Sequence, residues 1–209
     1  MKFSKFEDWE PYYLQILDDF GFDRATDEEA ARVLDGLLPR DSLPLLRRRI
    51  RGKAVTVCGN APSLDRELNR LSGVVVAADR AADRLYRHGT RPAAIATDLD
   101  GATEAFVEMN RKGTVLVVHA HGDNIPLLRW WVPQIPGPVV GTTQARPVGR
   151  VHNFGGFSDG DRAVFLAHAL GASSVTLAGF DLDDEDVNPV KRKKLRWARR
   201  LLSLVGHDL

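Results

Sequence analysis

The sequence has a single cysteine, no excess of charge and no long apolar run, and each absence excludes a class of protein. Cys58 is the only cysteine among the 209 residues, so no disulfide can form within one chain, and a reducing, cytoplasmic location is expected. No apolar run approaches the roughly 20 residues of a membrane-spanning helix, so no membrane partner is expected. The formal net charge of +1 provides no overall field for binding nucleic acid.

Two common phosphate-binding signatures are also missing, because the chain has neither G-x-G-x-x-G nor G-x-x-x-x-G-K-[ST]. The nearest substitute is "CGNAPSL", residues 58–64, where a glycine turn follows an apolar run and precedes a possible helix. Backbone N–H groups in such a turn can hold phosphate, although a plain turn with Ser63 as the helix cap explains it equally well. Without a loop lysine, the phosphate charge needs another counter-charge.

Residues 1–51 are expected to form a helical N-terminal extension, separate from an α/β domain over residues 52–209. Apolar side chains recur at helical spacing in the first 20 residues, and Thr26 is expected to cap a second helix that starts with acidic residues. A third short helix is expected to start at Ser42.

From residue 53 onward, short apolar runs alternate with segments of helical length. Runs that are apolar on both faces and alternate with helices predict a doubly wound, mostly parallel sheet with helices on both faces. The predicted strands are residues 54–58, 74–78, 93–97, 115–119, 138–142 and 175–179.

Four aspartates stand where the predicted strands end: Asp79, Asp98, Asp100 and Asp123. Ligands of such sheets bind outside the carboxyl ends of the strands, which share one edge. Each aspartate could simply cap the following helix. Together they would repel one another unless a cation neutralised them, and Mg²⁺ prefers carboxylate oxygens combined with phosphates and water. The pattern therefore favours a magnesium site.

A second candidate segment is "NFGGFSDGDRA", residues 153–163. Its two glycines allow close backbone approach, and its aromatic and acidic side chains suit a flat heterocycle. A capped helix with a flexible entry is the alternative. The binding candidates here are Asn153, Phe154, Gly155, Gly156, Ser158, Asp159 and Asp161, and Asp181 after the last strand joins them.

Two features leave other possibilities open. His119 and His121 form an H-x-H pair that could hold zinc or another transition metal in a hydrolase. The segment 191–200, "KRKKLRWARR", is strongly basic and is typical of a solvated helix face. Lys191 or Lys194 could instead fold over a triphosphate.

The motifs, taken in order, resemble a known family. The segment "AADRAADRLYRHGTRPAAIATDLDG" resembles a region of thiamin pyrophosphokinases. More closely, "CGNAPSL", "TDLDG", "HAHGDN", "GTTQ", "NFGGFSDGDRA" and "LAGFDL" resemble the archaeal 6-hydroxymethyl-7,8-dihydropterin pyrophosphokinases, over about residues 53–200. No single motif is specific, but their order and spacing are.

The resemblance implies that pyrophosphate passes from ATP to the pterin hydroxymethyl group with release of AMP, in tetrahydromethanopterin or folate synthesis. It implies Mg²⁺ as cofactor, with Asp98, Asp100 and Asp123 as catalytic groups and Asp79 as a further metal ligand. Gly59, Asn60, Pro62, Ser63 and Asp79 would bind ATP. Residues 153–161 and Asp181 would bind the pterin.

This chain departs from the family pattern at two positions: Ala61 stands where many relatives have glycine, and Ser158 where threonine is common. ATP and a small pterin are the expected partners, and a homodimer is possible because related pyrophosphokinases are commonly dimers. Two alternatives to the pyrophosphokinase remain: a metal-dependent hydrolase built on His119 and His121, and a transferase that uses a sugar nucleotide, since sialyltransferases have similar G-N-G-P-S loops.

Overall fold

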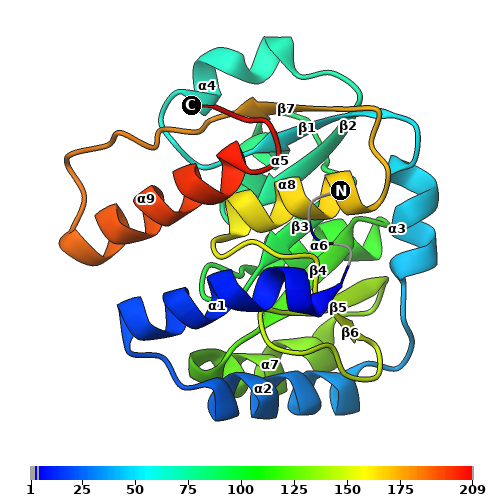
Figure 1. Cartoon of the computed structure of the whole chain (residues 1–209). Helices are drawn as coiled ribbons and strands as arrows, with labels where there is room; N and C mark the ends of the chain where they lie inside the picture. Colours follow the sequence, from blue (N-terminus) through cyan, green and yellow to red (C-terminus); the bar gives the residue numbers. More distant parts are fainter. Residues whose placement is uncertain (1–2, 4, 209) are drawn as a thin grey trace.

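The computed structural model describes residue 3 and residues 5–208, and it is built around one seven-stranded sheet. All six strand pairs run parallel, in the spatial order β6-β5-β4-β3-β2-β1-β7 (Figure 1). The doubly wound α/β prediction is confirmed. The strands are β1 (Ala54–Cys58), β2 (Val74–Ala78), β3 (Ala94–Thr97), β4 (Val115–Ala120), β5 (Val139–Thr143), β6 (Val151–His152) and β7 (Ser174–Ala178).

Helices cover both faces of the sheet, which is why the strands are apolar on both sides. One face packs against α2 (Arg24–Leu37), α5 (Ala81–Arg87), α6 (Glu104–Arg111) and α7 (Ile125–Trp131). The other packs against α3 (Leu43–Ile50) and α8 (Asp159–Ala169). Successive residues alternate between the faces: Val115 and Val117 lie in the second core, and Leu116 and Val118 in the first.

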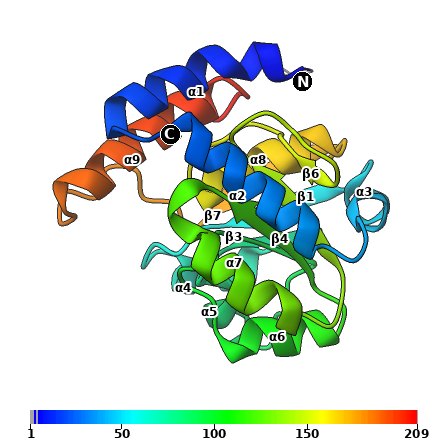
Figure 2. The same ribbon diagram turned by 90° about the horizontal axis from the view of Figure 1, so that it is seen from below.

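Outside α8 lies a further layer made of α1 (Phe6–Phe20) and α9 (Pro189–Ser203). Figure 2 shows these two helices side by side, although they come from opposite ends of the chain. Trp9 and Tyr13 of α1 are buried in one aromatic cluster with Phe165 of α8 and Trp197 of α9. The expected N-terminal helices are therefore present and are packed against the α/β layers.

Two local expectations needed revision. Thr26 is not the cap of α2: the helix starts at Arg24, and the Asp23 carboxylate accepts a hydrogen bond from the Thr26 N–H at 3.1 Å. An N-cap side chain reaches the N–H groups two or three residues ahead, so the capping residue lies before Thr26. The two-residue strand β6 was also not predicted, because so short a run has no detectable period.

The chain leaves strand β7, at one edge of the sheet, on the opposite face from its neighbour β1. The segments that follow β1 to β4 lead to helices on the first face, whereas β6 leads to α8 and β7 to α9, both on the second side. Neighbouring strands β1 and β7 therefore send their chains to opposite faces, which opens a crevice at their carboxyl ends. Across the ranges that the structure describes, no helix is both long and apolar enough to cross a membrane.

Candidate active site

A cleft of ≈ 750 Å³ occupies this crevice between the loops that follow β1 and β7. The loop Gly59–Pro62 forms one side, the loop Gly179–Asp184 forms another, and α9 closes the cleft from outside. Asp79 and Asp159 line it from the centre of the sheet edge. The volume is within the range of clefts that hold cofactor-sized ligands.

The loop after β1 is shaped by close contact with the loop after β7. A Cβ on Gly59 would lie 2.5 Å from the Gly179 carbonyl oxygen, so only glycine fits there. The Gly59 and Ala61 N–H groups already donate to the carbonyls of Ala178 and Gly179, at 2.8 and 2.9 Å. The predicted phosphate cradle thus has two of its backbone donors occupied.

Three further observations limit this loop as an anion site. Arg84 of α5 donates to the carbonyls of Asn60 and Ala61 and pairs with Asp65 at 2.7 Å, so its charge is engaged. The helix after the loop, α4 (Leu64–Glu67), has only four residues and offers a weak dipole. Ser63 does not cap it, and over the described residues the buried Ser63 hydroxyl has no hydrogen-bond partner.

Asp79 is held at the floor of the cleft by its neighbours. Its backbone adopts φ = 45°, a left-handed conformation that is uncommon outside glycine. The Thr97 hydroxyl donates to Asp79 Oδ1 at 2.8 Å, and a Cβ on Gly101 would overlap the Asp79 carboxylate. Burial raises the pKa of Asp79 above its usual value. The carboxylate is thus pressed against the loop 98–101.

Asp98 and Asp100 follow β3 and behave as a coupled pair. The Asp100 N–H donates to Asp98 Oδ1 at 3.2 Å. Burial by itself raises the pKa of Asp98, but the contact with His121 and the positive charge of Arg162 bring it below the usual value. Burial and the charge of Asp98 raise the pKa of Asp100 to about 6. A cation bound beside two carboxyl groups this close would relieve their mutual repulsion.

The loop after β4 supports this pair through Asn124, which was not singled out from the sequence, and through His121. Asn124 is buried and donates through Nδ2 to the carbonyls of Asp98, at 2.8 Å, and His119, at 2.7 Å. His121 Nε2 lies 3.4 Å from Asp98 Oδ2. Asp123, which was predicted as a metal ligand, is instead exposed on the 3₁₀ turn η2 (Gly122–Asn124), so its role stays a prediction.

The donor set fits a hard cation that takes only part of its coordination from protein. In the described part of the chain, no three Asp, Glu, His or Cys side chains are already arranged as a metal site. Asp79, Asp98 and Asp100 nevertheless perturb one another's pKa through their charges. Magnesium commonly uses one or two carboxylates and completes its shell with phosphate oxygens and water, which suits this cluster.

Several of the predicted substrate-binding residues in 153–161 stabilise the loop itself. The Asn153 side chain donates to the carbonyls of Gln144 and Ala145, at 2.9 and 2.8 Å. Asp161 is fully buried and accepts hydrogen bonds from the Phe157 N–H and from Ser158, closing a capping box at the start of α8. These side chains shape the loop and are not free to meet a ligand.

The rest of this segment lines a second hollow, which we call the recess; its volume of ≈ 10 Å³ is room for about one water molecule. It is formed by Phe154, Gly155, Asp159 and Arg162 together with residues at the ends of β3, β4 and β5: Ala96, Thr97, Val117, His119, Thr142 and Thr143. Asp159 lines both the recess and the cleft, so the two are adjacent. Burial, followed by the charge of Asp98, raises the pKa of Asp159, and Arg162 Nη1 lies 3.2 Å from its Oδ1.

His119 sits at the bottom of the recess and is not placed as half of a metal-binding pair. Its Nδ1 lies 3.1 Å from the Thr142 hydroxyl, and its buried Nε2 has no partner among the described residues. Burial and the charges of Arg162 and His121 lower the pKa of His119, so the ring is neutral. The rings of His119 and His121 are 6.2 Å apart, and His121 is directed to Asp98.

Asp181, which was predicted to bind the pterin together with residues 153–161, lies on the β7 side of the cleft with Phe180, and not in the recess beside Phe154. Lys191 and Lys194 of α9 line the opposite wall, together with Leu195 and Ala198. Their spacing along α9 puts these four residues on one helix face, a signal that could have been read from the sequence.

Comparison with known proteins decides the family. Residues 34–187 match the family described as 6-hydroxymethylpterin diphosphokinase MptE-like. The chain belongs to this family. Three archaeal relatives are named 6-hydroxymethyl-7,8-dihydropterin pyrophosphokinase. The protein of Methanothermobacter thermautotrophicus is 44% identical over 93% of this chain and 92% of its own length. Those of Pyrococcus furiosus and Methanocaldococcus jannaschii are 37% and 35% identical, over 98% and 94% of this chain and 95% and 94% of theirs.

For this MptE-like protein, the matched span contains both loops of the cleft and all the strand-end aspartates. It ends at residue 187, immediately before α9. The family model thus covers the floor and the loops of the cleft, and the alignment with the Pyrococcus furiosus relative, over 98% of this chain, extends into α9.

Proposed function

We propose that the protein transfers the β,γ-diphosphate of ATP to the hydroxymethyl oxygen of 6-hydroxymethyl-7,8-dihydropterin and releases AMP. The hydroxyl oxygen attacks the β-phosphorus, the bond from that phosphorus to the α,β-bridging oxygen breaks, and the hydroxyl proton passes to a base. Family membership supports the pterin as acceptor. ATP as donor and AMP as product rest on the site.

The observation that carries the proposal is the position of the carboxylate cluster relative to the cleft. Asp79 lines a cleft large enough for a nucleoside triphosphate, and its carboxylate lies against the loop that contains Asp98 and Asp100. A polyanion would not enter such an acidic floor alone, because like charges repel strongly at short range. The arrangement suits a nucleotide that arrives with a cation.

We propose Asp79, Asp98 and Asp100 as the residues that hold Mg²⁺. The bound ion would neutralise phosphate charge and stabilise the charge that develops during transfer. The protein supplies the positioning: Asn124 fixes the backbone of Asp98, Thr97 orients Asp79, and an ionised carboxylate beside the pterin hydroxyl accepts its proton. Transfer of this type needs orientation and charge neutralisation more than a covalent intermediate.

We propose that the pterin binds in the cleft on its Asp159 side, next to the recess, which has room for only about one water molecule. Phe154 lines the recess, and His119 Nε2 and Arg162 Nε are buried polar atoms without partners in the described structure. Unpaired buried groups cost stability, so a bridging water that links them to the ring would gain affinity. We also propose a cytoplasmic location, in which Cys58 stays reduced.

The test is to incubate the protein with ATP, Mg²⁺ and 6-hydroxymethyl-7,8-dihydropterin and to identify the nucleotide product by chromatography. AMP, formed in a one-to-one ratio with pterin diphosphate, is expected; ADP would refute diphosphate transfer. Asp98→Asn should reduce turnover to background, and Asp18→Asn, which removes an exposed carboxylate of α1, should leave turnover unchanged. Tightly bound zinc with hydrolysis of the substrate would favour the hydrolase instead.

A further inference from the structure

The outer wall of the cleft is the amino-terminal half of α9, the basic helix. The carboxyl-terminal half of α9 is anchored by Trp197, Ala198, Leu201 and Leu202, which are buried. Its first turns contact the cleft through Lys191, Lys194 and Leu195. One end of α9 is therefore fixed by the core, and the other presents lysines to the ligand space.

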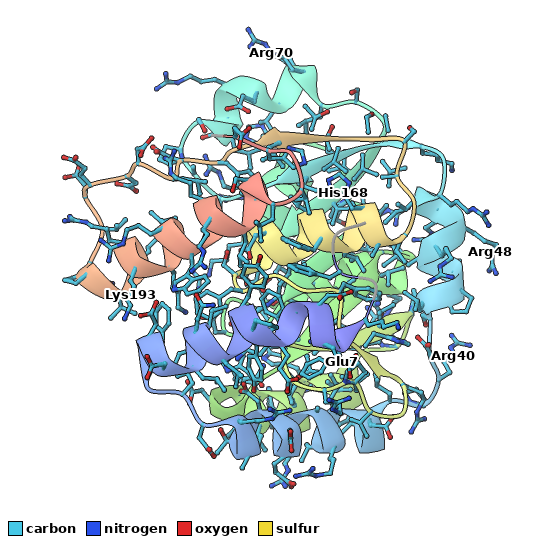
Figure 3. All side chains as sticks on the ribbon, in the orientation of Figure 1. Glu7, Arg40, Arg48, Arg70, His168 and Lys193 are labelled. Atoms are coloured by element: carbon cyan, nitrogen blue, oxygen red, sulfur yellow. The ribbon has the colours of Figure 1, made fainter. Side chains whose placement is uncertain are left out.

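Most of the other cationic side chains on α9 are already engaged elsewhere. Lys193 pairs with Asp19 of α1 and lies 4.9 Å from the centre of the Phe20 ring, and Figure 3 shows it at the end of α9 that faces α1. Arg192 donates to the Glu185 carbonyl at 2.6 Å. Arg199 pairs with Asp183, and Arg200 lies over the Trp197 ring. These contacts give the basic segment a structural role on its outer faces.

Lys191 and Lys194 form no ion pair among the residues that the structure describes, and both are exposed. The Lys194 ammonium lies 6.0 Å from the centre of the Phe157 ring, at the outer limit of a cation–π contact. Of the described residues that line the cleft, they are the cationic ones. Asp79 and Asp159 line the same cleft, so the two lysines share it with two carboxyl groups.

The loop after β1 provides little positive charge for binding phosphate. It has no lysine, two of its N–H groups are occupied, and Arg84 is turned to its carbonyls and to Asp65. A triphosphate brings about four negative charges into a cleft that is already acidic. Counter-charge from the protein must therefore come from across the cleft, where long flexible ammonium side chains act as mobile phosphate ligands.

We propose that Lys194, assisted by Lys191, binds the polyphosphate chain of the nucleotide from the α9 side of the cleft. The nucleotide's identity rests on the proposed function, whereas the phosphate role rests on the cleft. Lys194, on the inner turn, contacts the phosphates nearest the aspartates. Lys191, one turn nearer the cleft mouth, contacts the far end of the chain. α9 thereby closes on a bound triphosphate and holds it against the carboxylate floor.

The test uses Lys194→Met, with Lys193→Met as the matched control on the same helix. Calorimetry with ATP and Mg²⁺, without pterin, is compared with adenosine. Loss of a charge-assisted contact should weaken ATP binding by roughly 10- to 100-fold in Lys194→Met. Adenosine binding should be unchanged, and Lys193→Met should bind both ligands as the wild type does. Lys191→Met should show a smaller loss for ATP, and Lys194→Arg should recover part of the affinity.

The outcomes separate this inference from the proposed function. If the wild type binds ATP but forms no AMP, and Lys194→Met still weakens ATP binding alone, the function fails and the lysine assignment stands. If AMP is formed and Lys194→Met binds ATP normally, the assignment is wrong and the function stands. Equal losses for ATP and adenosine would show a merely structural role and overturn the assignment. Absence of any nucleotide binding by the wild type would overturn both.

Discussion

Asp27 links the N-terminal helices to the segments that follow β4 and β5. Its replacement is therefore expected to lower the stability of the folded protein. The side chain is 3% exposed. It accepts hydrogen bonds from the Tyr13 hydroxyl at 2.8 Å, the Gln144 amide at 2.8 Å and the Gly122 N–H at 2.9 Å. These three donors come from α1, from the segment after β5 and from η2. Asp27→Ala would leave all three without an acceptor.

The magnitude of the loss can be worked out from these contacts. A hydrogen bond to a charged group contributes about 1.5–3 kcal/mol, but bonds that share one acceptor do not add. Each buried donor that is left without an acceptor costs about 1–3 kcal/mol, and here there are three neutral donors. We therefore expect Asp27→Ala to lower the free energy of unfolding by about 4 kcal/mol. For a chain of this length that corresponds to a fall in Tm of roughly 8–16 °C.

Urea unfolding followed by tryptophan fluorescence measures this loss, because Trp9 lies in the same N-terminal aromatic cluster as Tyr13. Asp23→Ala is the control: it removes the exposed cap of the same helix and should cost about 1 kcal/mol. Asp27→Asn keeps the volume and one acceptor oxygen, so it should fall between the two. If Asp27→Ala costs no more than Asp23→Ala, the network does not connect the helices to the sheet.

Three other predictions concern the site and pH. Gly101→Ala should reduce kcat by about 100-fold with little loss of stability, because the added methyl group would displace the Asp79 carboxylate; steady-state kinetics checks it. Asn124→Ala should cost about 1–3 kcal/mol in urea unfolding, since two loop carbonyls lose their donor. Burial lowers the pKa of both His168 and His207, so the free energy of unfolding should fall as pH drops below about 6.5, and replacing both with Gln should make that fall shallower.

The sign of the histidine prediction is set by linkage between protonation and folding. A histidine whose pKa is lower in the folded protein binds its proton more readily in the unfolded chain. Above the pKa that the histidine has in the unfolded chain, its neutral form contributes fully to the stability of the fold. This contribution is lost as pH falls from that pKa to the lower pKa of the folded protein. His168 Nε2 and His207 Nε2 lie 3.1 Å apart, a distance at which two charged rings would repel.

The strand-end aspartates show which parts of the candidate site could be predicted from the sequence pattern. Parallel strands share one carboxyl edge, so the residues immediately after each strand were expected to meet there, and Asp79, Asp98 and Asp100 do. The same reasoning could not separate Asp123, which is exposed on η2, from its neighbour Asn124, which supports Asp98. On a turn, neighbouring side chains point in different directions, so one can be buried and the next exposed. The local sequence pattern does not show which of the two is buried.

Residues 153–161 illustrate a second limit. The glycines and the polar side chains were interpreted as ligand contacts, whereas Asn153 and Asp161 satisfy backbone groups of their own loop. A polar side chain in a loop can serve either the backbone or a ligand, and the sequence looks the same in both cases. Only the placement of the nearby carbonyl and N–H groups distinguishes them.

The sequence by itself determined the class of fold, most of its order of elements and the sheet edge that carries the aspartates, because hydrophobic periodicity and strand direction are local properties. The tertiary structure decided which distant segments share the cleft. α9 meets β7 and the loop after β1 only because the reversal of the chain between β1 and β7 opens a crevice there and the aromatic cluster of α1 and α8 anchors Trp197 beside it. That packing places two of the chain's seven lysines in the same cleft as Asp79. Their spacing shows that they share a helix face, but not which distant segment that face meets.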